Sequence, residues 1–177
     1  MRDRAGLVVV DLQERLLPAM HQPERVVGEA VRLLRGAAVL GLPVVATEQY
    51  PKGLGRTAPA VAAALAPATP FEKTAFSACG AKGLPAELEN KKIKDVILCG
   101  IEAHVCVSQT CLDLLDRGLR VFVVTDAVSS RTPENLQVGL ERMRDAGAVL
   151  VSTEMVLFEL LGEAGTEEFK RILELVR

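Results

Sequence analysis

Residues 97–118, ILCGIEAHVCVSQTCLDLLDRG, join an apolar run to an amphipathic segment through a short interruption. The run DVILCG (95–100) predicts a buried strand, and residues 105–117 predict a helix because apolar side chains recur there at helical spacing. Cys106 lies at the junction, shortly after Glu102 and His104. A strand that leads through a loop into a helix is the repeating unit of a parallel sheet.

The same alternation of strand and helix runs along the whole chain. Strands are predicted at 7–10, 43–47, 69–71, 95–100, 120–127 and 148–153, and helices at 24–40, 60–65, 85–92, 105–117, 133–146, 154–161 and 166–176. The Gly- and Pro-rich residues 48–59 predict a loop. Right-handed βαβ units then build an α/β fold around a parallel sheet of six strands.

Composition narrows the class of protein. Hydrophobic residues make up 49% of the chain and aromatic residues only 3%, which predicts an aliphatic core of the kind that parallel strands form. The 177 residues predict a single domain, 1–177. The net charge of −2 argues against a nucleic-acid partner. No run approaches the roughly 18–20 apolar residues of a membrane span, and no secretory signal opens the chain. We therefore expect a cytoplasmic protein with no membrane partner and reduced thiols.

Three polar positions follow predicted strands: Asp11, the Glu72–Lys73 region and residues 101–106. Because ligands bind beyond the carboxyl ends of parallel strands, these positions converge on one edge of the sheet. Each has an ordinary interpretation as well. Asp11 is a good N-cap for a helix starting near Leu12, and Lys73 could be a surface lysine. If both meet Cys106, the carboxylate can accept a thiol proton and the ammonium can favour a thiolate.

Cys106 is predicted to open a helix. The unpaired N–H groups and positive dipole end of a helix lower the pKa of a thiol, and they can hold an oxyanion. The competing interpretation is a small buried packing residue, which is also what Cys99 and Cys111 are predicted to be. His104 is too close in sequence to reach the Cys106 sulfur easily, and a place in the pocket lining suits it better.

Metal and cofactor signatures are absent from the sequence. Two scattered histidines and no Cys-x-x-Cys pair leave too few ligands for zinc. There is no Gly-x-Gly-x-x-Gly and no Walker sequence. We predict no metal and no cofactor.

Several stretches together resemble a known family. VVVDLQERL, FEKTAFSAC and CGIEAHVCVSQTCLDLLDRGLRVFVVTDAVSSR are similar to the isochorismatase-like cysteine hydrolases. TEQYPKGLG, GIEAHVCV and DAVSSR resemble the branch named isochorismatase domain-containing proteins. The resemblance implies a three-layer α/β/α Rossmann-like fold with a six-stranded parallel sheet. It also implies a catalytic triad, whose matching positions are Asp11, Lys73 and Cys106.

The resemblance implies further features of the site and the reaction. A non-proline cis peptide joins Ile101 to Glu102, and the backbone N–H groups of Glu102 and Cys106 act as oxyanion donors. The reaction is hydrolysis of a small amide-type (C–N) substrate through a thioester, and the protein is a homo-oligomer, either dimer or tetramer.

Two departures refine this expectation. The segment TEQYPKGLGRTAP lacks the histidines of the nicotinamidase metal site, and isochorismatases proper act on a vinyl ether without a cysteine nucleophile. Substrate contacts are assigned from loop positions to Gln13, Tyr50, Phe76 and His104. The alternatives on the same fold are a non-catalytic binding or scaffold protein and a redox-sensing thiol at Cys106. The identity of the substrate is left open.

Overall fold

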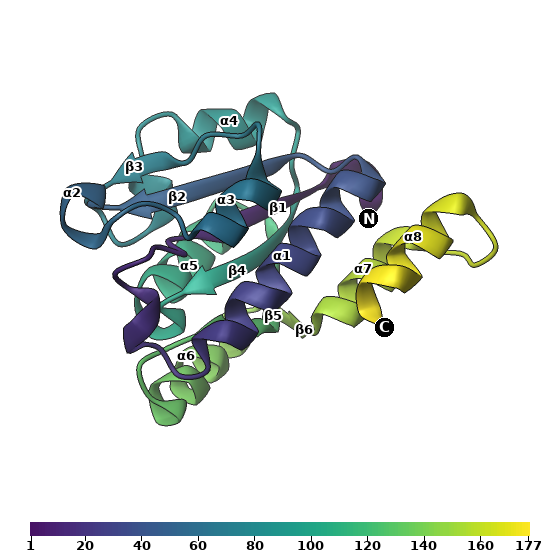
Figure 1. Cartoon of the computed structure of the whole chain (residues 1–177). Coiled ribbons are helices and arrows are strands. Elements are labelled where there is room, and N and C mark those ends of the chain that lie inside the picture. Colours follow the sequence, from purple (N-terminus) through teal and green to yellow (C-terminus); the bar gives the residue numbers. More distant parts are fainter.

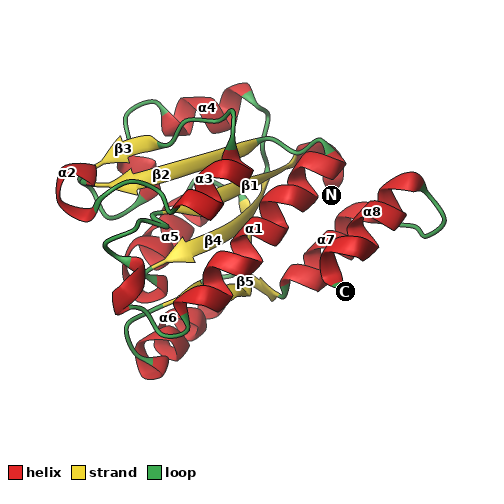
Figure 2. Ribbon diagram, in the orientation of Figure 1, coloured by secondary structure: helices red, strands yellow, loops and turns green.

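Six parallel strands form the middle layer of the computed structural model, which describes all residues, 1–177 (Figures 1 and 2). The strands are β1 (Ala5–Val10), β2 (Val44–Gln49), β3 (Phe71–Lys73), β4 (Asp95–Ile101), β5 (Arg120–Ser129) and β6 (Val149–Val151). Their order across the sheet is β3-β2-β1-β4-β5-β6, and every neighbouring pair is parallel. The predicted six-stranded parallel sheet is confirmed.

Helices cover both faces of this sheet and complete three layers. One face carries α1 (Pro23–Leu40), α3 (Pro59–Leu65), α7 (Thr153–Leu161) and α8 (Glu167–Val176), and the other carries α4 (Leu84–Asn90), α5 (Ser108–Asp116) and α6 (Pro133–Asp145). Short 3-10 turns lie at Arg2–Arg4, Leu17–Ala19 and Ala78–Gly80. No helix combines the length and the apolar character that crossing a membrane requires.

Two apolar clusters separate these layers. Successive side chains of a strand point to opposite faces, so Leu7 and Val9 of β1 pack toward α1, whereas Val8 and Val10 pack toward α5. The predicted buried residues Cys99 and Cys111 are confirmed. Because both faces of the central strands are covered, these strands read in the sequence as unbroken apolar runs.

Three local predictions differ from the structure. The predicted loop 48–59 contains a one-turn helix, α2 (Pro51–Leu54), which starts at a proline, a residue well suited to a first helical position. The predicted helix at Leu12 does not form; Asp11 adopts the left-handed conformation (φ 53°), and the chain turns there. The predicted helix 105–117 instead begins as a π-helical turn, Ala103–Val107, that continues into α5.

The order of the strands reverses around β1, which pairs with β2 on one side and β4 on the other. In open α/β sheets, ligands bind beyond the carboxyl ends of the strands at such a switch point, which here lies between β1 and β4. Gly100 brings these two ends together. It has φ 121°, and a Cβ at this position would overlap the carbonyl oxygen of Val10.

Candidate active site

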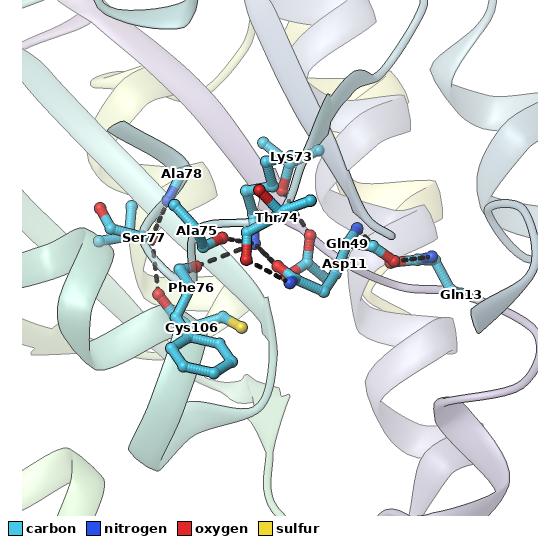
Figure 3. Close-up of polar contacts among 12 residues, drawn as sticks. Asp11, Gln13, Gln49, Lys73, Thr74, Ala75, Phe76, Ser77, Ala78 and Cys106 are labelled. Atoms are coloured by element: carbon cyan, nitrogen blue, oxygen red, sulfur yellow. Dashed lines mark hydrogen bonds and ion pairs between the residues drawn. The ribbon is translucent and has the colours of Figure 1, made fainter. Parts of the chain in front are cut away.

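Asp11, Lys73 and Cys106 meet at the carboxyl edge of the sheet (Figure 3). Asp11 directly follows β1, Lys73 ends β3, and Cys106 belongs to the π-helical turn after β4. Parallel strands bring these three positions together because all their carboxyl ends face the same side.

Asp11 and Lys73 form a fully buried ion pair. Lys73 Nζ lies 2.7 Å from Asp11 Oδ2, and both side chains are 0% exposed. Burying charges is costly unless each is paired and hydrogen-bonded. Thr47 Oγ1 accordingly donates to Asp11 Oδ1 at 2.7 Å, while Lys73 Nζ also donates to Gln49 Oε1 at 2.6 Å and to the carbonyl of Phe76 at 2.9 Å. The interpretations of Asp11 as a helix cap and of Lys73 as a surface lysine are therefore wrong.

The thiol of Cys106 is buried beside this pair, with 5% of the residue exposed. Burial raises the pKa of Cys106 to about 12, and the negative charge of Asp11 adds to the rise. The charge of Lys73 and the backbone N–H of Glu102 act in the opposite direction but do not outweigh burial. The expectation of a lowered Cys106 pKa is therefore wrong. The site instead holds a protonated thiol next to a carboxylate that can accept its proton.

Residues 102–107, called the nucleophile turn here after the role proposed below for Cys106, are connected to the loop that follows Lys73. Thr110 Oγ1 donates to the carbonyl of Cys106 at 2.6 Å and accepts from the backbone N–H of Ala78 at 2.8 Å. This single hydroxyl joins the backbone of Cys106 to the loop whose Phe76 carbonyl accepts from Lys73. The lysine and the thiol are thus held by one connected network (Figure 3).

Glu102 begins the nucleophile turn. The peptide bond between Ile101 and Glu102 is cis. The carbonyl of Glu102 accepts from the N–H groups of Val105 (3.0 Å) and Val107 (3.1 Å). Its backbone N–H acts to lower the pKa of Cys106, against the larger effect of burial.

The four predicted substrate contacts occupy different environments. Gln13 is buried, and its amide bonds to the backbone of Gln49 (2.9 and 2.7 Å) and of Gly55 (2.8 Å), an arrangement that joins loops rather than offering free polar groups. Tyr50 and Phe76 are more than half exposed. The ring Nδ1 of His104 lies 2.9 Å from Ser130 Oγ. Tyr50 and Phe76 are thus the two of these side chains that are open to solvent.

A cavity of about 380 Å³ adjoins the cluster at β3. Its lining includes Tyr50, Lys52, Lys73, Thr74 and Lys82, but neither Asp11 nor Cys106. No group of three or more His, Cys, Asp or Glu side chains is arranged to hold a metal ion. The chemistry that the cluster itself offers is acid–base and nucleophilic.

Sequence reasoning missed several residues that build the site. Thr47 is opposite Val10 in the register of β1 and β2, so correct strand pairing would have placed its hydroxyl near Asp11. Thr110 is four residues after Cys106, one helical turn away, and no sequence motif marked it as part of the site. Arg131 ends the motif DAVSSR, yet its contact with Glu102 depends on the pairing of β4 with β5.

Comparison with known proteins identifies the family of the chain. Residues 5–155 match the family model described as the isochorismatase domain. Isochorismatase domain-containing protein 2 of Macaca fascicularis is 44% identical over 172 residues, which cover 97% of this chain and 82% of that protein. A human protein of the same name is 42% identical over the same share of each chain.

Solved structures show the same fold. A structure described as MAR1 ribonuclease from Caenorhabditis elegans is 43% identical, with a TM-score of 0.92 over 99% of this chain and 90% of that one. YcaC from Pseudomonas aeruginosa, with hexane-2,5-diol and covalent acrylamide, is 26% identical, with a TM-score of 0.91 over 98% and 89%. Together, the sequence match and the shared three-layer fold show that this chain belongs to the isochorismatase family.

Proposed function

We propose that residues 1–177 act as one cysteine hydrolase domain for small amide-type substrates, with Cys106 as nucleophile, Asp11 as general base and acid, and Lys73 as the stabilising charge. The observation that carries this proposal is the buried ion pair of Asp11 and Lys73 set against the Cys106 thiol. A packing cysteine has no need of a buried charge pair, which is costly to assemble.

The reaction follows from the positions of these groups. As the Cys106 sulfur attacks the substrate carbonyl, Asp11 accepts the thiol proton, and the backbone N–H groups of Glu102 and Cys106 donate to the oxyanion. The C–N bond then breaks as Asp11 returns the proton to the leaving nitrogen, which leaves a thioester. Water attacks the thioester, Asp11 again accepts a proton, and the carboxylic acid leaves as the thiol is restored.

The raised pKa of Cys106 supports proton transfer in concert with attack rather than a pre-formed thiolate. A thiol with a pKa of about 12 is protonated at neutral pH, so the adjacent carboxylate must take the proton when the substrate arrives. The same burial argues against a redox sensor, since sensor thiols are exposed and have a low pKa. The related YcaC structure holds covalent acrylamide, an electrophile that reacts with nucleophiles through its alkene.

Two other functions are separable by experiment. A non-catalytic scaffold would keep the fold without turnover. The name of the C. elegans structure suggests RNA cleavage as a second candidate. The net charge of −2 and the 5% exposure of Cys106 disfavour a large polyanion at this site.

A likeness to YcaC from Escherichia coli, described as an octameric hydrolase, leads us to propose a homo-oligomer for this chain as well.

The decisive experiment is ammonia release from a panel of small primary amides, with RNA cleavage measured in parallel. We expect turnover in the wild type and a loss of at least about 10³-fold in Cys106→Ala and in Asp11→Asn, because each removes a reacting group. Cys99→Ala, which alters a buried thiol of the neighbouring strand, is the matched control and should keep its activity. Undiminished amide turnover in Cys106→Ala would refute the mechanism. RNA cleavage that needs Asp11 without any amide turnover would favour the second candidate.

A further inference from the structure

Glu102, the first residue of the nucleophile turn, forms an ion pair with Arg131. Arg131 Nε and Nη2 each lie 3.0 Å from one carboxylate oxygen of Glu102. The Glu102 side chain is 8% exposed and that of Arg131 is 64% exposed, so a surface guanidinium reaches in to a buried carboxylate. Such two-point contacts restrict the orientation of both partners as well as pairing their charges.

Glu102 is the residue through which this pair can act on the thiol. Its carbonyl accepts from the N–H groups of Val105 and Val107, the two chain neighbours of Cys106. A carboxylate held at two points limits rotation of the whole residue, and therefore limits movement of the turn that its carbonyl holds. Arg131 does not itself act on the sulfur: the charged groups that do are Asp11 and Lys73.

We infer that Arg131 is a positioning residue: by clamping the Glu102 carboxylate, it holds the turn that carries Cys106, and with it the Glu102 N–H that serves as an oxyanion donor in the proposed reaction. The inference rests on the proposed function, because it assigns a task to a donor of that reaction. It extends that function to a residue at the surface, one that touches neither the thiol nor the ion pair of Asp11 and Lys73 in the structure.

The opposite end of β4 provides a natural control. Asp95 is 0% exposed and receives Arg120 Nε and Nη2, each at 2.7 Å, in the same two-point geometry. Asp95 begins β4 and Glu102 follows its last residue, so the two pairs lie at opposite ends of one strand. A purely structural role for Arg131 predicts that its loss resembles the loss of Arg120.

The experiment measures alkylation of Cys106 by iodoacetamide against pH, resolved by peptide mass spectrometry, on the full chain. We expect Arg131→Gln to move the profile to higher pH and to slow alkylation at pH 8 roughly tenfold, since the sulfur loses a donor and gains an unpaired carboxylate nearby. Arg131→Lys keeps the charge but not the two-point contact, and should fall between Arg131→Gln and the wild type. Arg120→Gln should lower the melting temperature without moving the profile.

A second comparison tests whether Arg131 acts through Glu102. In a Glu102→Gln background no carboxylate is left to clamp, so adding Arg131→Gln should shift the profile less than it does in the wild type. The double variant leaves no unpaired buried charge, so it avoids the defect that could prevent Arg131→Gln from folding. Should Arg131→Gln fail to fold, Arg131→Lys is the variant to compare with the wild type.

The outcomes separate this inference from the proposed function. An unchanged profile in Arg131→Lys and Arg131→Gln, with Cys106 reactive in the wild type, would overturn the positioning role and leave the hydrolase proposal standing. Equal shifts in Arg120→Gln and Arg131→Gln would also overturn it. A wild-type Cys106 that reacts no faster than Cys99 at any pH would overturn the positioning role alone, because the hydrolase proposal requires a protonated thiol and is tested by amide turnover.

Discussion

Two buried carboxylates, one at each end of β4, are clamped by arginines from the two ends of β5. Asp95 pairs with Arg120, its direct neighbour in the sheet register, and Glu102 pairs with Arg131, two residues beyond the end of β5. Both pairs satisfy a buried charge. Only the second pair includes a residue of the turn that carries Cys106. Similar geometry therefore stabilises the sheet at one end and can orient a reacting group at the other.

Two glycines near the two ends of the sheet differ in what a side chain at their position would contact. A Cβ at Gly6, in β1, would meet the side chain of Ile93, whereas a Cβ at Gly100, in β4, would overlap the backbone of Val10. A side chain can rotate away, but the backbone of a central strand cannot. The amino end of the sheet should therefore tolerate substitutions that the carboxyl end does not.

The largest expected effect is that of Gly100→Ala. The new Cβ overlaps the Val10 carbonyl and φ is positive, so we expect a loss of unfolding free energy on the order of 4 kcal/mol. Urea denaturation gives this value, and Gly6→Ala is the matched control with the smaller expected loss, because only the Ile93 side chain must move. Equal losses in the two variants would contradict the distinction between backbone and side-chain contact.

The next effect concerns Asp95→Asn. Hydrogen bonds from Arg120 and then Arg4 hold the pKa of Asp95 below its usual value. A lowered pKa in the folded state contributes stability above the unfolded-state pKa of about 3.9, and this contribution is lost as the pH falls through the folded-state value. Because both arginines are more than half exposed, we expect Asp95→Asn to lose only about 1–2 kcal/mol at pH 7.

Urea denaturation at pH 7 and at pH 3 tests this prediction. The difference between wild type and Asp95→Asn should be full at pH 7 and smaller at pH 3. Alkylation of Cys106 should be the same in both proteins, because Asp95 lies at the far end of β4 from the nucleophile turn. A shifted alkylation profile in Asp95→Asn would mean that the two ends of β4 are coupled.

The smallest effect on stability is expected for Gly139→Ala in α6. A Cβ at Gly139 would lie 3.0 Å from the backbone of Ala103 and His104, so it presses on the nucleophile turn, while alanine is the better helix former. These effects oppose each other, and we expect a net change within about 1 kcal/mol.

Cys106 alkylation in Gly139→Ala should nevertheless slow several-fold, because the added Cβ displaces the nucleophile turn slightly. The control is Gly36→Ala in α1, where the contact is the side chain of Leu157 on the other face of the sheet. Gly36→Ala should leave Cys106 alkylation unchanged. A slower reaction in both variants would indicate general loosening rather than displacement of the turn.

The sequence alone determined the class of fold and the places where the site would be found. Strands that are buried on both faces appear in the sequence as unbroken apolar runs. The segments between them carry apolar residues at helical spacing, so the order of strands and helices can be predicted without any tertiary contact. The rule that ligands bind at carboxyl ends then selected Asp11, the Glu72–Lys73 region and residues 101–106, and the family resemblance narrowed these to Asp11, Lys73 and Cys106. Each of these positions is marked by a local pattern that can be recognised in the sequence alone.

The tertiary structure decided the chemistry at those positions. The left-handed turn at Asp11, the buried pairing with Lys73 and the raised pKa of Cys106 all depend on which groups surround a side chain once water is excluded. Sequence reasoning predicted a lowered thiol pKa because it counted a helix end and a lysine but could not count desolvation. The clamp of Arg131 on Glu102 was equally hidden, since it joins residues that only the pairing of β4 with β5 brings together.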